Sequence, residues 1–375
     1  MTVSLPQQPS NAMRDNITIT HSLTHNLLAW FTENQRSLPW RKKYSPYHVW
    51  IVEIMGQQTQ MERVVTYFKN WIKQFPDIRT LAAASEQEVI KAWEGLGYYS
   101  RVRNIRKTAT ILMQEYGGKV PDNEVQLLAL PGIGPYTAAA LLSIAFNRPV
   151  PLVDANVERV ICRLDDIDQP VKQAATRKLL IQRCAELLPQ ENARDFNQAL
   201  MEFGALICTP KKPACSTCPV QQYCQAYQKD IVDLRPIPGK KKKQLDIFMA
   251  CGIIQHSNRF YIQQRLENDI WGGLWEFPGG RIKEGESPEQ AAVREIREET
   301  EFQVTDLRSL ATVVHYYTKY RVTLDAFFCT LQDSGKKIQP EPVLHAASQY
   351  KWVTFNELPT FAFPAGHRQL IEKLR

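Results

Sequence analysis

Two carboxylates in apolar surroundings are the side chains of this sequence best suited to catalysis. Glu53 lies in WIVEIMGQQT (50–59), a segment that predicts a helix with apolar residues on nearly every side. Such surroundings raise the pKa of a carboxylic acid and suit it to donate a proton. Asp154, in VDANV (153–157), stands where a helix is expected to begin, and a helix N-terminus favours an ionised carboxylate. One protonated and one ionised carboxyl group can cleave a glycosidic bond; the alternatives are a solvent-facing Glu53 and an Asp154 that only caps its helix.

Four of the eight cysteines lie close together, at Cys208, Cys215, Cys218 and Cys224. In a reducing compartment such a cluster predicts a metal centre rather than disulfides. Structural zinc sites usually present two close pairs of ligands, whereas only Cys215 and Cys218 form a close pair here. The spacing therefore leaves both zinc and an iron–sulfur cluster open.

A glycine-containing turn, LPGIG (130–134), is expected to join two helices. Gly132 and Gly134 would expose backbone N–H groups in front of the second helix, an arrangement that binds phosphate. The alternative is a helix–helix turn without a ligand.

The elements that must hold these residues are helical in the first part of the chain. Apolar residues recur at helical spacing from Leu23 to about Cys224, with helices expected at 47–74, 87–93, 105–116, 136–146, 173–187 and 194–207. The polar residues 1–22 predict a flexible tail, and Pro-Ile-Pro-Gly followed by four lysines predicts a basic linker over 236–246.

The remaining residues, 247–375, predict an α+β domain. Strands are expected at 247–254, 260–264, 320–328 and 350–353, and a helix at 287–300. On that helix Glu295, Glu298 and Glu299 share one face, where three carboxylates either hold Mg²⁺ against a pyrophosphate or are simply solvated.

The composition sets limits on the class of protein. With 44% hydrophobic and 23% charged residues the chain is globular, and a net charge of +7 fits a nucleic-acid partner. No apolar run is long enough to cross a membrane, and the N-terminal residues lack a secretory pattern. We expect a cytoplasmic monomer, associated with the nucleoid if the cell is bacterial.

Several segments together are similar to the adenine DNA glycosylase (MutY) family. They are LPW (38–40), PYHVW (46–50), VEIMGQQTQ (52–60), GLGYYSRVRN (95–104), LPGIGPYT (130–137), VDANV (153–157) and the cysteine loop. The resemblance covers residues 23–235 and implies an all-α helix-hairpin-helix glycosylase domain closed by a [4Fe–4S] cluster on the four cysteines. It also implies duplex DNA with adenine opposite 8-oxoguanine or guanine as the substrate.

The resemblance also implies roles for individual residues. Glu53 would protonate adenine at N7, and Asp154 would stabilise the oxocarbenium-like sugar with help from Tyr136 and Asn156. Tyr136 stands where the related endonuclease III enzymes carry a Schiff-base lysine, which implies a monofunctional glycosylase. The residues implied to contact the base or the DNA are Trp40, Arg41, Gln57, Gln58, Thr59, Tyr98, Gly132, Gly134 and Gln198, with Gln58 and Tyr98 wedged into the base stack. The chain departs from the family at Gly56, usually a bulky apolar residue, and at Ala155, usually Gly.

The C-terminal part resembles a Nudix-fold domain. The stretch from Gly280 to Phe302 is similar to the Nudix box, except that Glu301 replaces the usual late glycine. In one alternative the domain reads 8-oxoguanine in the duplex, and Thr318 offers a hydroxyl to the base. In the other it hydrolyses 8-oxo-dGTP or another nucleoside triphosphate, with Mg²⁺ held at Gly280, Glu295, Glu298 and Glu299, and the chain is a bifunctional enzyme. A DNA-damage-binding protein without catalysis is a third alternative, disfavoured because both carboxylates are present.

Overall fold

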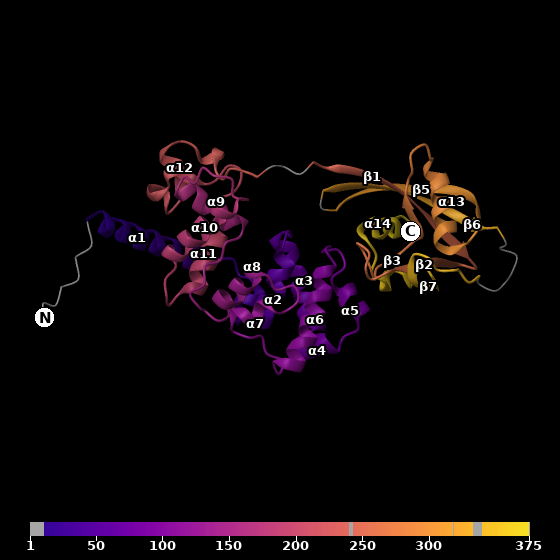
Figure 1. Ribbon diagram of the computed structural model, residues 1–375, viewed down its shortest axis with the longest axis horizontal. Helices are drawn as coiled ribbons and strands as arrows, with labels where there is room; N and C mark the ends of the chain where they lie inside the picture. Colours follow the sequence, from indigo (N-terminus) through magenta and orange to yellow (C-terminus); the bar gives the residue numbers. More distant parts are fainter. Residues whose placement is uncertain (1–10, 240–242, 318, 333–339, 375) are drawn as a thin grey trace. The chain divides into compact units, whose positions relative to one another are not determined.

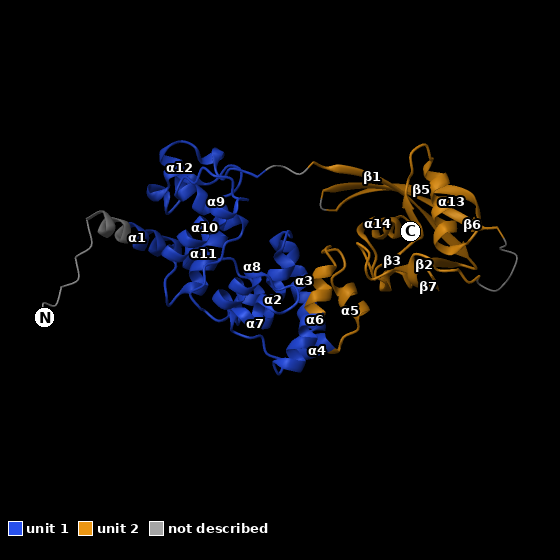
Figure 2. Ribbon diagram, viewed as in Figure 1, with its two compact units in different colours: residues 1–82, 107–241 blue, residues 83–106, 242–375 orange. Residues whose placement is uncertain are grey.

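The computed structural model describes residues 11–239, 243–317, 319–332 and 340–374, with side chains from residue 19 onward (Figure 1). The chain divides into two compact units, Met1–Ala82 with Lys107–Lys241, and Ala83–Arg106 with Lys242–Arg375 (Figure 2). In the described ranges no helix has the length and apolar character that a membrane crossing needs.

The first unit is helical, as the periodicity predicts. Its elements are α1 (Asn11–Asn34), η1 (Pro39–Lys42), α2 (Pro46–Gly56), α3 (Met61–Gln74), α4 (Ile78–Ala83), α6 (Ser100–Glu115, shared with the second unit), α7 (Glu124–Leu128), α8 (Pro135–Ala140), the π-helical turn η2 (Leu141–Ala145), α9 (Ala155–Leu164), α10 (Ala174–Leu187), α11 (Ala193–Leu206), η3 (Cys215–Thr217), η4 (Gln221–Tyr223), α12 (Gln225–Gln228) and η5 (Val232–Leu234).

One apolar core of this unit joins helices that are far apart in the sequence. Leu27 of α1, Val160 of α9, Leu180 of α10 and Phe203 of α11 are all buried in it, and three of the clustered cysteines pack against its edge. Burying these side chains removes a large apolar area from water, which fixes α9 and α11 relative to the cysteine loop.

The second unit is a sheet covered by helices. It contains α5 (Glu86–Ala92), β1 (Leu245–His256), β2 (Arg259–Arg265), β3 (Trp275–Glu276), β4 (Gly279–Arg281), α13 (Pro288–Thr300), β5 (Val304–Tyr317), β6 (Tyr320–Leu331), β7 (Ala347–Val353), η6 (Leu358–Thr360) and α14 (Ala365–Lys373). The strand order is β3-β2-β1-β6-β5, with β4 paired to β1 and β7 to β2. The pair β1–β6 is parallel and the others are antiparallel.

Two apolar cores cover the faces of this sheet. One contains Ile296 of α13, and the other contains Leu370 and Ile371 of α14. Helix α13 lies very close to β1, because a side chain added at Gly252 would meet Ile296 Cδ1 at 2.3 Å. The cores therefore make a three-layer α/β/α arrangement, in agreement with the expected α+β domain.

Two expected boundaries differ from the structure. Helix α1 begins at Asn11, inside the expected tail of residues 1–22, since extending a helix that is already anchored by Leu23 and Leu27 costs little. Residues 1–10 lie outside the described ranges. The segment 83–106, which we expected within a continuous domain at 23–235, belongs to the second unit because its side chains bond to that unit's loops.

Candidate functional site

A cavity of about 990 Å³ in the first unit contains most of the predicted site residues. Helices α2, α9 and α11 supply its walls. The predicted residues that line it are Trp40, Arg41, Glu53, Gln57, Gln58, Thr59, Tyr136, Asp154, Asn156 and Gln198. Gly56 and Ala155, the two positions at which the sequence differs from the family pattern, also line the cavity. A side chain at Gly56 would enter open space.

Glu53 is held inside the cavity by helix α2, whose other faces are buried. Tyr136 Oη, from α8, donates a hydrogen bond of 2.9 Å to Glu53 Oε2. Burial raises the pKa of Glu53 to about 7, opposed by the hydrogen bond from Tyr136 and assisted by the charge of Asp154. Burial also raises the pKa of the Tyr136 hydroxyl well above its usual value, so Tyr136 remains a donor. Glu53 is therefore available in its protonated form near neutral pH.

Asp154 is the N-cap of α9, and it also faces the cavity. Its Oδ1 accepts from the Val157 backbone N–H at 2.8 Å, and its Oδ2 accepts from Asn156 Nδ2 at 3.0 Å. Burial raises the pKa of Asp154, and both hydrogen bonds and the charge of Arg159 oppose that rise. The capping role and the catalytic role proposed from the sequence are thus compatible in one residue.

Arg159 and Gly204 complete this region, although sequence reasoning did not select them. Arg159 Nη2 donates to Asn156 Oδ1 at 2.9 Å and to the Gly204 carbonyl at 2.7 Å, and its Nε donates to the Cys208 carbonyl at 2.7 Å. A side chain at Gly204 would meet Asn156 Cβ at 2.7 Å. The close approach of α11 to α9 therefore sets the position of Asn156, and Arg159 links it to the cysteine loop.

A buried ion pair forms the wall of the cavity beside Trp40. Glu202 is 2% exposed and accepts hydrogen bonds from the side chains of both Arg36 and Arg41. Arg41 Nε donates to Gln198 Oε1 at 3.0 Å. Glu202, which the sequence alone did not single out, therefore orients Arg41, and Arg41 in turn bonds to the second predicted pocket residue, Gln198.

The two predicted wedge residues share an unusual backbone conformation. Gln58 has φ 60° and Tyr98 has φ 47°, both in the left-handed region that side chains other than glycine rarely adopt. Such conformations persist where surrounding contacts enforce them, and they concentrate at functional positions. Tyr98 lies in the second unit, whereas Gln58 lies in the first.

The predicted hairpin lies between α7 and α8. Gly132 has φ 77°, which the turn requires, and Gly134 is the N-cap of α8 with open space at its Cα. Thr108 Oγ1 anchors the turn by donating to the Pro131 carbonyl at 2.8 Å. The backbone of this turn is accessible, as a phosphate contact requires.

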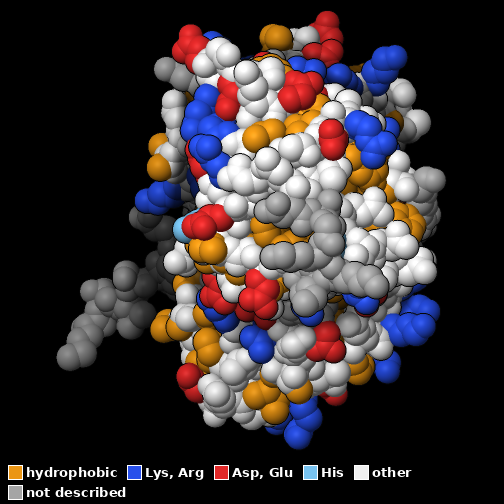
Figure 3. Space-filling view, turned by 90° about the vertical axis from the view of Figure 1, so that its right-hand side faces the viewer, with side chains coloured by type: hydrophobic (Ala, Val, Ile, Leu, Met, Phe, Trp, Pro, Cys, Tyr) orange, Lys and Arg blue, Asp and Glu red, His pale blue; other side chains and the backbone are white. Residues whose placement is uncertain are grey.

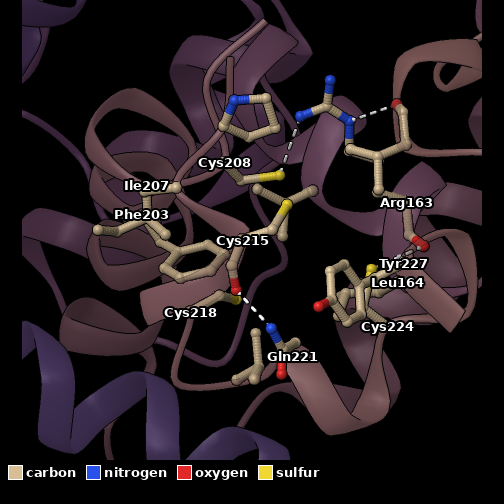
Figure 4. A pocket seen from close by; sticks show the side chains of 15 residues that line it. Arg163, Leu164, Phe203, Ile207, Cys208, Cys215, Cys218, Gln221, Cys224 and Tyr227 are labelled. Carbon is tan, nitrogen blue, oxygen red and sulfur yellow. Dashed lines mark hydrogen bonds between the residues drawn. The ribbon is translucent and has the colours of Figure 1, made fainter. Parts of the chain in front are cut away.

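The four clustered cysteines surround a small cavity between α9, α11 and the loop (Figure 4). Its walls are apolar, with Val160, Leu164 and Phe203 among them. Arg163 Nη1 lies 3.4 Å from Cys208 Sγ, and none of the four thiols is in a disulfide. An apolar cavity with four thiol ligands and a nearby cationic donor fits a cluster of iron and sulfide, whose thiolates carry negative charge.

Among the described residues no three His, Cys, Asp or Glu side chains are arranged to hold one metal ion.

The carboxylates expected to hold Mg²⁺ in the second unit bond to other groups of the protein, and the magnesium site stays a prediction. Arg294 donates to Glu295 Oε1 at 2.7 Å and to Glu298 Oε2 at 3.1 Å. Glu299 turns inward and accepts from the Gly279 N–H at 3.0 Å and from Gln263 Nε2 at 2.9 Å. Arg294 also donates to both carboxylate oxygens of Glu286, so one guanidinium group is shared by three carboxylates.

Two further residues predicted in the second unit are Gly280 and Thr318. Gly280 lies against Glu295, since a side chain at that position would meet the Glu295 carboxylate at 2.4 Å, and its role as a ligand stays a prediction. Thr318 lies outside the described residues.

On the face drawn in Figure 3, Asp and Glu side chains are interspersed with Lys and Arg side chains, so this face shows no large patch of a single charge.

The fold and the site define a class of protein, a helix-hairpin-helix DNA glycosylase of base excision repair with a Nudix domain. Residues 51–186 match the HhH-GPD superfamily of base excision DNA repair proteins, residues 208–224 the iron–sulfur binding domain of endonuclease III, and residues 249–373 the NUDIX domain. A thermostable thymine-DNA glycosylase has a similar fold, with a TM-score of 0.52 and 29% identity over 57% of this chain and 99% of its own.

Sequence similarity to known proteins identifies the family within this class. The chain is 39% identical over 253 residues to an adenine DNA glycosylase of Buchnera aphidicola from Schizaphis graminum, a match that covers 67% of this chain and 73% of the relative. It is 30% identical over 393 residues to the human adenine DNA glycosylase, covering 90% of this chain and 71% of the relative. The chain belongs to the adenine DNA glycosylase family.

Proposed function

We propose that this DNA glycosylase removes adenine that is paired with 8-oxoguanine or guanine in duplex DNA. The observation that carries the proposal is one cavity in which Glu53, bonded to Tyr136, faces the same space as Asp154, bonded to Asn156. The volume of about 990 Å³ exceeds that of a purine, so an extruded adenine and its sugar can enter together.

The roles of the two carboxyl groups follow from their surroundings. Protonated Glu53 donates its proton to adenine, and the bond between the sugar C1′ and the base N9 breaks with its electron pair leaving on the base. Asp154 faces the positive charge that develops on the sugar and stabilises it electrostatically. Water then adds to C1′ and loses a proton, which leaves an abasic site.

The cavity wall beside Trp40 contains the residues that recognise the adenine base. Arg41 is held by Glu202 and bonds to Gln198, and amide and guanidinium groups fixed in this way can read the edge of a purine. The hairpin N–H groups around Gly132 and Gly134 bind a backbone phosphate, and Gln57, Gln58 and Thr59 contact the DNA beside the vacated position.

The cysteine loop binds a [4Fe–4S] cluster through Cys208, Cys215, Cys218 and Cys224. When bound, the cluster supplies a rigid anchor for the loop and performs no step of the hydrolysis. Through Arg159 the Cys208 carbonyl and the Asn156 side chain share one guanidinium group, so a folded loop helps to place Asn156.

We expect the wild-type protein to release adenine from duplexes with A:8-oxoguanine and A:G, but not from A:T. The product strand should remain intact until alkali is added, because Tyr136 offers no amine for Schiff-base chemistry. Single-turnover assays with an end-labelled adenine strand test both points. Release from A:T at the same rate, or strand cleavage without alkali, would contradict the proposal.

For the Nudix domain we propose that it reads the oxidised base within the duplex and does not hydrolyse nucleotides. The bonds of Glu295 and Glu298 to Arg294, and of Glu299 to Gly279 and Gln263, support this proposal. We place Thr318 at the base contact on the resemblance alone.

We expect no turnover of 8-oxo-dGTP in the presence of Mg²⁺, since Glu295 and Glu298 already bond to Arg294 and Glu299 bonds to Gly279 and Gln263. Pyrophosphate release by the full chain is compared with release by Glu298→Gln, and the two should be equally low. Turnover in the wild type that disappears in Glu298→Gln would mean that Arg294 yields to the metal and that the domain is a second enzyme.

A further inference from the structure

The segment 83–106 is bonded to the Nudix-fold loops through one carboxylate, that of Glu94. Its Oε1 accepts from the Phe363 backbone N–H at 2.9 Å and from Arg368 Nε at 2.8 Å, and Arg368 Nη2 bonds to it as well. Its Oε2 accepts from Lys91 Nζ. The side chain is 17% exposed, so these charge-assisted bonds are largely shielded from solvent.

A second set of bonds fixes the same segment at Gln87, seven residues before Glu94. Gln87 Nε2 donates to the Gly273 carbonyl at 3.2 Å, and Gln87 Oε1 accepts from Trp275 Nε1 at 3.1 Å. Trp275 is 2% exposed and belongs to β3 of the sheet. Helix α5 is therefore part of the second unit's packing, and Figure 2 colours it with the strands.

The turn that follows Glu94 carries Tyr98. Gly95 and Gly97 have φ 93° and 67°, and Tyr98 has φ 47°. The centroid of the Tyr98 ring lies 5.8 Å from that of Tyr317 at the end of β5, and the Arg101 guanidinium carbon lies 5.2 Å from the Tyr98 ring centroid. Backbone in this conformation is strained for tyrosine, so it depends on contacts such as these.

From this geometry we propose that Glu94 is a positioning residue for lesion selectivity. It fastens the turn carrying Tyr98 to the Nudix fold, so that the wedge residue and the β5–β6 hairpin move as one body. This inference rests on the proposed function, in which Tyr98 enters the base stack and the hairpin reads the oxidised base. A loosened turn would then weaken the advantage of 8-oxoguanine over guanine more than it weakens cleavage itself.

The test is the ratio of single-turnover rates for A:8-oxoguanine and A:G duplexes, measured with the full chain. We expect Glu94→Gln to lower this ratio about tenfold, with the A:G rate within about twofold of the wild type. Arg368→Gln should give the same loss, and the double variant should lose no more than either single variant. Glu372→Gln, an exposed change on the same helix as Arg368, is the matched control and should keep the wild-type ratio.

Any other outcome overturns either the inference about Glu94 or the proposed function. An unchanged ratio in Glu94→Gln and Arg368→Gln overturns the inference. Equal loss on both duplexes also overturns it, because the contact would then serve stability or cleavage in general. If the wild-type protein releases no adenine from either duplex, or shows no preference between them, the proposed function fails instead, before any variant is considered.

Discussion

Replacing Glu53 by Gln is expected to slow adenine release about a thousandfold, because the amide has no proton to donate to the departing base. The amide keeps the size of the side chain and still accepts the hydrogen bond from Tyr136 Oη. The protein should therefore fold and bind duplex DNA as the wild type does. Single-turnover release of adenine from an A:8-oxoguanine duplex measures the effect.

The matched control for this change is Glu62→Gln. Glu62 also lines the cavity but is exposed on α3, outside the pair of carboxyls. Its rate should stay close to that of the wild type. Adenine release at the wild-type rate by Glu53→Gln would contradict the assignment of the proton donor.

Replacing Glu202 by Ala is expected to lower the free energy of unfolding by about 3–5 kcal/mol, the usual cost of removing one partner from a buried ion pair. Burial alone would raise the pKa of Glu202, but hydrogen bonds from Arg36 and Arg41 outweigh it and hold the pKa at about 2. In the variant the Arg41 guanidinium, 10% exposed, would lose its counterion. Denaturant unfolding measures the loss.

The pH dependence of this ion pair has a definite sign. A carboxyl whose pKa is lowered by folding stabilises the native state above its unfolded pKa of about 4.3. That contribution is lost as the pH falls from there toward about 2. The control for Glu202→Ala is Glu33→Ala, a change at an exposed position on α1. It should change the free energy of unfolding by less than about 0.5 kcal/mol. A Glu202→Ala protein as stable as this control would contradict the account.

The residues that could be predicted from the sequence are those with a local signal. Glu53 stands in an apolar helix, Asp154 at a helix start, and the cysteines in one loop, and each signal lies within a few residues of the group. Most helices of the first unit follow their apolar periodicity for the same reason. The exception is the expected helix at 47–74, which is two helices, because α2 ends at Gly56 and α3 begins at Met61.

The residues that were missed act over long separations in the sequence. Glu202 pairs with Arg36 and Arg41, and Arg159 bonds to the Cys208 carbonyl. An arginine or glutamate on a helix is usually solvated, so only the fold shows that these charges are buried. Glu94 is a further case, because its partners lie about 270 residues away along the chain.

The second unit was harder to predict for reasons of strand geometry. Strand β5 (Val304–Tyr317) was not expected, and its pairing with β6 shifts register at two places, which breaks the alternation that marks a strand. Strands β3 and β4 have only two and three residues. The helix face with Glu295, Glu298 and Glu299 was predicted from their spacing. The hydrogen bonds from Arg294 to Glu295 and Glu298 were not, because they depend on side-chain rotamers, which the spacing of residues does not specify.

The measurement that tests the central claim most directly is the pH dependence of adenine release by the wild type and by Tyr136→Phe at saturating enzyme. Since Glu53 must be protonated, we expect the wild-type rate to fall as the pH rises through about 7. The hydrogen bond from Tyr136 lowers the pKa of Glu53, so its removal should move this descending limb to higher pH. A wild-type rate that does not change between pH 5 and 9, roughly two units on either side of the expected pKa, would contradict the account, and so would a limb that does not move in Tyr136→Phe.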